Sequence, residues 1–402
     1  MFIELLIFAL VGIAFGVFTG ITPGIHINLI AVILLSISPF LLHFFSPLSI
    51  ACLIIAMSIT HTFLDFIPST FLGAPEEGTA LSVLPAHRLL LRGMAYEAIR
   101  LSSIGSLLSL IVVGCSSIFL IKIIPTIYNS IKNYIGWILL AVVVFMIIKS
   151  KNRNKIFWSA FVFSLAGVFG VVVFSLHLKD PLFPMFSGMF GTSMLITSIF
   201  ERVVIPKQRL TEMIEVKKKK LLKATAAGSF AGGLTSIFPG VGPAQAAIVA
   251  SQLSGKLGIY SYIILIGGIG TASMMMSLIT LFSIEKARNG SIVVVQQLLQ
   301  NIGMKEFYIF IAAAFIAGGI AVFLSLYFAK IFSGLITKVN YQLLCVSIIF
   351  IIAVLSVILT GWTGFFILIV STSLGLLPPL LKIGRNHLMG ALLLPIILYF
   401  IL

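Results

Sequence analysis

The chain has 402 residues, of which 60% are hydrophobic and only 9% are charged, and this composition excludes a soluble globular domain. The net charge of +15 does not indicate nucleic-acid binding, because the basic residues cluster in short loops between apolar runs. Apolar runs of membrane length recur along the chain, so the sequence predicts an all-α polytopic membrane protein. We expect it to lie in the plasma membrane, where membrane lipid is a partner and nucleic acid is not.

The first two apolar runs, residues 2–19 and 29–45, are separated by a short stretch that contains Gly20, Pro23 and Gly24. Proline has no backbone N–H, and glycine adopts conformations that other residues avoid. A helix broken here leaves a half-helix whose free N–H groups and positive dipole end can hold an anion. In a membrane such a break persists only inside protein or beside a wet cavity. The alternative is a proline kink with glycines for close packing.

The same pattern returns 216 positions later, where Pro239 and Gly240 correspond to Pro23 and Gly24. Two Gly/Pro-interrupted segments at corresponding places in two halves are a sequence pointer to a transport site. The sequence therefore predicts two membrane repeats and a connector between them. The first repeat is residues 1–200, the basic cytoplasmic linker is residues 201–223, and the second repeat is residues 224–402.

Charge placement predicts that the two repeats are inserted in opposite orientations. One short loop of the first half carries Lys149, Lys151, Arg153 and Lys155, whereas the corresponding loop at 360–364 carries no basic residue. Cytoplasmic loops are enriched in Lys and Arg, so the two loops lie on opposite sides of the membrane. We therefore expect inverted-topology repeats, each with a Pro-Gly-broken helical hairpin, about seven crossings per half and both termini outside.

Groups around the two breaks form the predicted substrate site. The first break contributes Gly20, Pro23, Gly24, His26 and Asn28, and the second contributes Ser236, Pro239, Gly240, Gly242 and Gln245. His26 and Asn28 directly follow the first Pro-Gly pair, where their side chains can donate to an anion beside the half-helix. No cofactor or metal site is predicted.

Three acidic residues are predicted to couple transport to Na+ or H+. Asp65 ends an apolar run, and Glu76 and Glu77 lie in a Gly/Pro-rich turn that can re-enter the membrane. Ionisable groups at membrane depth are costly and are usually functional. Asp65 alternatively caps a helix or pairs with Arg88.

Enzyme signatures are missing from the sequence, which contains no HExxH, GxSxG or Walker A motif. We therefore expect no enzyme, and without an ATPase motif transport must run on a gradient. An intramembrane enzyme would require His26, His61 and Asp65 to converge, but we interpret His61 as a core residue. We interpret residues 385–387, Arg-Asn-His, as an interfacial anchor, with contact to a head group or substrate as the alternative.

The repeated break, the Pro/Gly-rich ends of both halves and the segment 71–88 resemble the TctA family, especially its short archaeal-type members. TctA is the large membrane subunit of tripartite tricarboxylate transporters. The resemblance implies uptake of small carboxylates cradled by the two breaks. It also implies a small membrane subunit and an extracytoplasmic binding protein as partners. The chain departs from the family pattern in having Pro68-Ser69 instead of Pro-Gly, and in lacking an Asn-rich segment around 253–262.

Together these observations predict a secondary, ion-gradient-driven symporter of small organic anions, with di- and tricarboxylates as substrates. The anion would bind at two opposed Pro-Gly helix breaks near the midplane. The alternative is a translocase of a lipid-linked anion such as polyprenyl phosphate, in which the hairpins hold the phosphate while the tail stays in lipid.

Overall fold

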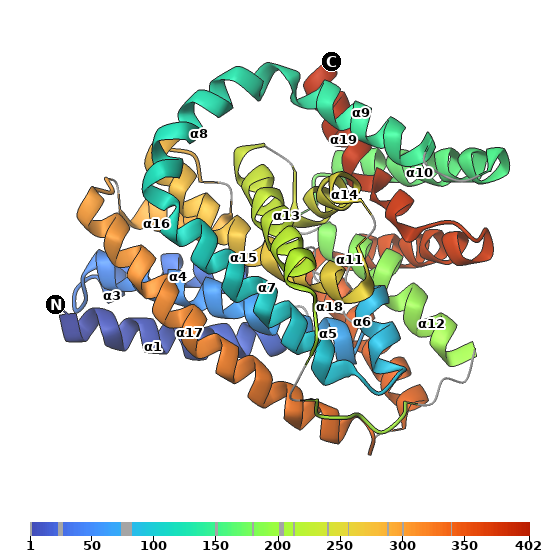
Figure 1. Cartoon of the computed structure of the whole chain (residues 1–402), viewed down its shortest axis with the longest axis horizontal. Coiled ribbons are helices and arrows are strands. Elements are labelled where there is room, and N and C mark those ends of the chain that lie inside the picture. Colours follow the sequence, from blue (N-terminus) through green and yellow to red (C-terminus); the bar gives the residue numbers. More distant parts are fainter. Residues whose placement is uncertain are drawn as a thin grey trace.

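The computed structural model describes residues 2–22, 27–73, 83–148, 152–178, 181–200, 205–211, 214–238, 241–255, 257–287, 289–299, 301–338 and 340–402. These residues form helices and no strand (Figure 1). Eight of the helices are long and apolar enough to cross a membrane, and the bent pair of α8 and α9 can add a ninth. The predicted all-α polytopic class is confirmed. The expected seven crossings per half include helices such as α2, whose 10 residues are too short to span a bilayer.

The helices of the first half alternate long spans with short connecting pieces. They are α1 Phe2–Ile21, α2 Ile27–Ser36, α3 Ser38–Leu41, α4 Pro47–Leu64, α5 Phe66–Phe71, α6 Val83–Leu90, α7 Ala95–Cys115, α8 Ser117–Ile131, η1 Lys132–Tyr134, α9 Ile135–Ile148, α10 Arg153–Ser175, α11 Leu182–Phe186, the π-helix η2 Ser187–Thr192 and α12 Ser193–Phe200. Beyond its first turn, α4 is buried on every side, because other helices pack around it.

The second half begins within the basic stretch, since its first helix starts at Lys218. Its helices are α13 Lys218–Ile237, α14 Pro243–Leu253, α15 Ile259–Ile284, α16 Gly290–Leu298, α17 Met304–Leu335, α18 Tyr341–Leu380, η3 Arg385–Met389 and α19 Gly390–Ile401. Within α18, Gly361 has a positive φ of 74°, a conformation that suits glycine, and it breaks the helix into two stretches. The sequence predicts these two stretches at 341–360 and 362–377.

α1 packs along α4 in the same direction, with Gly12 against Leu53 and Gly20 against Leu64. At the far end, the backbone N–H of Ser46 donates to the Glu4 carboxylate over 3.2 Å, which brings the start of α4 beside the start of α1. Since 20 helical residues span about 30 Å, the chain must travel back along α1 through α2 and α3. α1 and α2 therefore form a hairpin, joined across residues 23–26, which lie outside the described residues.

The first helices of the second half have packing contacts similar to those of α1. α13 and α14 begin 216 positions after α1 and α2. Gly228, which corresponds to Gly12, packs against Leu265 of α15. Four residues later in α13, Gly232 packs against Ser273 of α15. The two breaks that share a Gly/Pro pattern thus also share a packing partner of the same kind.

α7 of the first half and α17 of the second half pack against each other in opposite directions. Leu110 meets Gly318, and the hydroxyls of Ser103 and Ser325 are hydrogen-bonded over 2.8 Å. As residue numbers fall along α7 they rise along α17. The two helices are therefore antiparallel.

Each half also packs its central helix along a helix of the other half. α4 runs parallel to α17, and α15 runs parallel to α7. The contacts that fix these directions are Phe63 with Gly318, Phe71 with Phe332, Tyr260 with Glu97, and Ser109 with Gly268. Because α7 and α17 are antiparallel, α4 and α15 are antiparallel as well.

The helices group into two bundles (Figure 1). The first bundle consists of α1, α4, α5, α7, α13, α15 and α17, and the second consists of α9, α10, α11, η2, α12, α18, η3 and α19. In the second bundle α10 packs on α19, where Gly170 lies against Ala391, and η2 packs on α18, where Gly188 lies against Ser371. Both pairings again join one element from each half.

Candidate functional site

The ends of both hairpins lie beside the crossing of α4 and α15. At the crossing, the hydroxyls of Thr62 and Thr271 are hydrogen-bonded over 2.8 Å, and both residues are buried. The end of α1 reaches this level because Gly20 packs on Leu64. α13 reaches it from the opposite direction, since the Ser236 hydroxyl donates to the Ser273 carbonyl over 2.9 Å. Two helix breaks thus approach one point from opposite ends of the first bundle.

The structure describes part of the predicted substrate site. Gly20 and Ser236 are buried at the ends of α1 and α13, and Gly242 lies at the N-cap of α14. Asn28 lies in the first turn of α2, where its side chain contacts Gly290 of α16. The remaining predicted residues lie outside the described residues: Pro23, Gly24, His26, Pro239, Gly240 and the side chain of Gln245.

Several hydroxyl residues near the crossing were missed at the level of sequence. The hydroxyls of Ser58 on α4 and Ser291 on α16 are hydrogen-bonded over 2.9 Å. The Asn289 side chain accepts from the Ser291 N–H over 3.1 Å, and the Asn289 N–H donates to the Ser277 hydroxyl over 3.0 Å. The start of α16 therefore joins the same region as the start of α2. Ser and Thr residues within otherwise aliphatic helices were the sequence signal that could have identified this region.

These groups can hold an anion without a formal positive charge. Hydroxyls donate hydrogen bonds, and the starts of α2 and α14 carry the N–H groups and the positive dipole end of a helix N-terminus. On α15, Ser273 and Gly270 are partly accessible although most of the helix is buried. The arrangement suits a ligand that brings negative charge into a region otherwise lined by aliphatic helices.

Asp65 lies at the junction of α4 and α5, three residues after Thr62, and is 8% exposed. Its side chain makes no cap hydrogen bond to α5, so the capping alternative is wrong. Glu76 and Glu77 lie outside the described residues. Asp65 is therefore the predicted coupling residue whose place near the crossing is known.

His61 is buried, and its Nδ1 is 3.1 Å from the Thr19 hydroxyl, in agreement with its interpretation as a core residue. Among the residues that the structure describes, no group of three His, Cys, Asp or Glu side chains could hold a metal ion. His26, the third residue of the enzyme alternative, lies outside that part of the chain.

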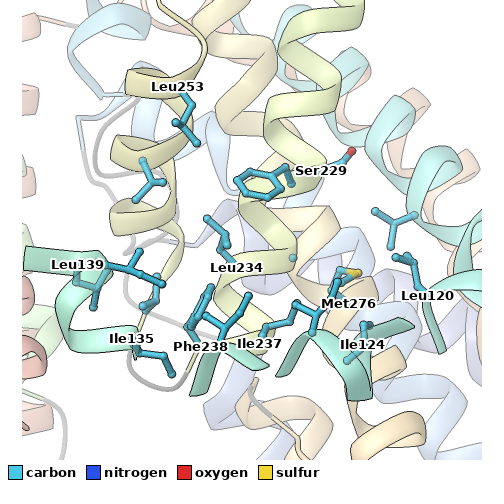
Figure 2. Close-up of a pocket in the computed structure, with 18 of the residues that line it drawn as sticks. Leu120, Ile124, Ile135, Leu139, Ser229, Leu234, Ile237, Phe238, Leu253 and Met276 are labelled. Carbon is cyan, nitrogen blue, oxygen red and sulfur yellow. The ribbon is translucent and has the colours of Figure 1, made fainter. Parts of the chain in front are cut away.

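An apolar cavity of about 570 Å³ lies between α8 and α9 on one side and α13 and α14 on the other (Figure 2). Its walls are largely aliphatic, and its polar side chains come from Ser116 and Ser229. Phe238 and Val241, on either side of the second break, line one part of it. The apolar cavity therefore extends to the end of the second hairpin.

The fold and this site define a multi-pass helical membrane protein with two interrupted hairpins that end at a shared central point. The chain belongs to the tripartite tricarboxylate transporter TctA family, whose family model matches residues 6–390. It is 31% identical over 408 residues to an uncharacterized protein of Methanocaldococcus jannaschii, and the match covers 98% of this chain and 99% of the relative. No solved structure matches the chain. The family resemblance seen in the sequence is thereby confirmed.

Proposed function

We propose that this protein is a secondary transporter of small organic anions, with di- and tricarboxylates as its substrates and no enzymatic activity. The observation that carries the proposal is the meeting of the two broken hairpins beside the Thr62–Thr271 crossing. Membership of a tricarboxylate transporter family supports the substrate class. The anion binds between the starts of α2 and α14.

The same packing supports inverted-topology repeats. Corresponding helices α7 and α17 are antiparallel, so a two-fold relation between the halves would have its axis perpendicular to these helices. For helices that cross a bilayer, such an axis lies in the membrane plane. Equivalent hairpins then enter from opposite faces and meet near the midplane, with both termini outside the plasma membrane.

Coupling to Na+ or H+ is assigned to Asp65, with Glu76 and Glu77 as further candidates. A buried carboxylate three residues from the crossing can share a cation with a bound anion, because each reduces the cost of burying the other's charge. The family name supports assembly with a small membrane subunit and an extracytoplasmic binding protein.

Uptake into proteoliposomes tests the proposal. The purified chain is reconstituted, and entry of labelled citrate and succinate is measured with and without a Na+ or a pH gradient. Gly242→Leu should abolish uptake, because a bulky side chain at the start of α14 blocks the approach of an anion to the free N–H groups.

Gly258→Leu is the matched control for this variant. Gly258 is the N-cap of α15, has the same extended backbone as Gly242, and has open space where a Cβ would stand. Both variants should insert and elute as the wild type does. Wild-type uptake by Gly242→Leu would contradict the hairpin site, and absence of carboxylate uptake by the wild type would contradict the function.

The apolar cavity favours a second function, translocation of a lipid-linked anion such as polyprenyl phosphate. A cavity that reaches Phe238 could hold an apolar chain while its phosphate lies at the second break. Leu234→Trp narrows the cavity and should slow scrambling of a fluorescent short-chain prenyl phosphate. If the protein is a carboxylate carrier, prenyl phosphate is not moved by the wild type, and Leu234→Trp leaves carboxylate uptake unchanged.

A further inference from the structure

Arg385 is buried inside the protein at the start of η3, with 9% of its surface exposed. Its neighbour His387 is also buried, at 4%. The interpretation of this segment as an interfacial anchor is therefore wrong for both residues, because an anchor side chain reaches the membrane surface. A cation removed from water in this way needs a partner.

Among the residues that the structure describes, Arg385 is hydrogen-bonded to one neutral hydroxyl. Its Nη1 donates to the Ser193 Oγ over 3.0 Å, and that hydroxyl in turn donates to the Met189 carbonyl. No carboxylate of the described residues pairs with Arg385; the ion pair found in that part of the chain joins Arg209 and Glu97. A guanidinium carries five N–H donors, so within the described part of the chain most of these donors and the whole charge remain uncompensated.

His87 of α6 is a second buried polar residue in this part of the protein, and it contacts Tyr341 of α18. Its Nε2 is 3.5 Å from the Tyr341 hydroxyl, the two rings are stacked with centroids 6.2 Å apart, and the residue is 5% exposed. Its Nδ1 has no hydrogen-bond partner among the described residues. Burial and the Arg385 charge lower the pKa of His87 to about 4, so the ring is neutral at pH 7. A neutral ring can still donate from one nitrogen.

The cluster of Arg385, His87, Tyr341 and Ser193 joins the two bundles. α6, which carries His87, packs against α5 and α7 of the first bundle, whereas the other three residues belong to η3, α18 and α12 of the second. η3 also contacts α14, the returning arm of the second hairpin. A ligand held by this cluster would therefore contact both bundles.

We propose that Arg385 and His87, with Tyr341, bind a carboxylate group of the transported anion between the two bundles. The identity of the ligand rests on the proposed function. Arginine matches a carboxylate because its planar fork donates two parallel N–H bonds, which Ser193 alone cannot replace. The bound carboxylate supplies the counter-charge that the described protein groups do not.

The test measures thermal unfolding of the purified full chain in neutral detergent, with citrate, succinate or inorganic phosphate, and separately with phosphatidylglycerol. Wild-type Tm should rise with citrate or succinate, because a ligand bound only to the folded state stabilises it. Arg385→Gln should weaken this effect at least tenfold in apparent Kd. Lys382→Gln is the matched control: Lys382 is exposed, carries the same charge and lies three residues earlier. It should behave as the wild type.

Without anion, the same variants separate a binding role from a structural one. Arg385→Gln should melt at or above the wild type, since it removes a buried charge that no described carboxylate compensates. A merely structural link to Ser193 predicts instead a lower Tm and an unchanged anion response. Should Arg385→Gln fail to fold, Arg385→Lys, which keeps the charge but loses the fork, and His87→Phe should each weaken the carboxylate response.

The proposal is overturned if Arg385→Gln, or its substitutes, respond to carboxylates as the wild type does. It is also overturned if no carboxylate raises the wild-type Tm, or if only phosphate or phosphatidylglycerol does. Failure of the proposed function is distinguishable. If carboxylates raise the Tm in an Arg385-dependent way but no uptake occurs in proteoliposomes, the binding site is supported and the transport function is refuted. If the wild type takes up carboxylates and Arg385→Gln responds to them as the wild type does, the Arg385 site is refuted and the transport function stands.

Discussion

The proposed equivalence of the two hairpins predicts that Gly16→Ala and Gly232→Ala destabilise the protein to a similar degree. A Cβ at Gly16 would stand 2.5 Å from the Met57 carbonyl oxygen, and one at Gly232 would stand 2.6 Å from the Ser273 nitrogen. Ordinary contact begins at 3.4 Å, so each helix pair must separate by about 1 Å. Overpacking costs about 1–3 kcal/mol, and the better helix propensity of alanine returns up to about 1 kcal/mol.

A net loss of about 1–2 kcal/mol is therefore expected for each variant, measured as a lower Tm in detergent by tryptophan fluorescence. Gly334→Ala on α17 is the control, because a Cβ there meets nothing within 4 Å. It should raise the stability by about 0.5–1 kcal/mol. The reasoning is refuted if either hairpin variant melts at or above Gly334→Ala. A large loss at one glycine and none at the other would show that the hairpins are not equivalent.

Three further predictions concern coupling, topology and the linker. Asp65→Asn should change the Na+ or pH dependence of uptake in proteoliposomes, and an unchanged response removes Asp65 from coupling. Ser103→Cys with Ser325→Cys should form a disulfide on mild oxidation, because the two hydroxyls are 2.8 Å apart, whereas Ser103→Cys with Ser333→Cys, two turns further along α17, should not. Glu97→Ala should expose the linker to protease and cost about 2 kcal/mol, since Glu97 is buried and accepts hydrogen bonds from Arg209 and Thr211. Unchanged proteolysis would show that this contact does not hold the linker.

Local breaks were predictable from the sequence because they depend on residue type at one place. α2 and α14 both begin just after a Pro-Gly pair, and α18 breaks at Gly361, as their sequences indicate. The separate helix α8 was not predicted, because its apolar residues continue the run of α7 without a strong Gly/Pro signal. Local pattern thus defines where helices stop when the breaking residues are Gly or Pro.

Partners across the fold could not be predicted in this way. The Thr62–Thr271 contact joins residues 209 positions apart, and it exists only because α4 and α15 pack as antiparallel helices. Arg385 looked interfacial because it lies in a polar stretch, and its burial depends on the packing of α10, α14 and α18 around η3 and on its hydrogen bond to Ser193 of α12. Charge in the sequence does not reveal the depth at which the folded chain places it.

Charge balance connects the hairpin site, Arg385 and Asp65 into one account of substrate choice. In the proposed binding mode the starts of α2 and α14 each contribute about half a positive charge, and Arg385 contributes a whole one, which gives about +2. A dicarboxylate is matched by this total, whereas a tricarboxylate exceeds it by one negative charge. A cation bound at Asp65 would offset this excess for a tricarboxylate, whereas a dicarboxylate has no excess to offset. Cation coupling should therefore be stronger for citrate than for succinate, and equal Na+ dependence of the two uptakes would contradict this account.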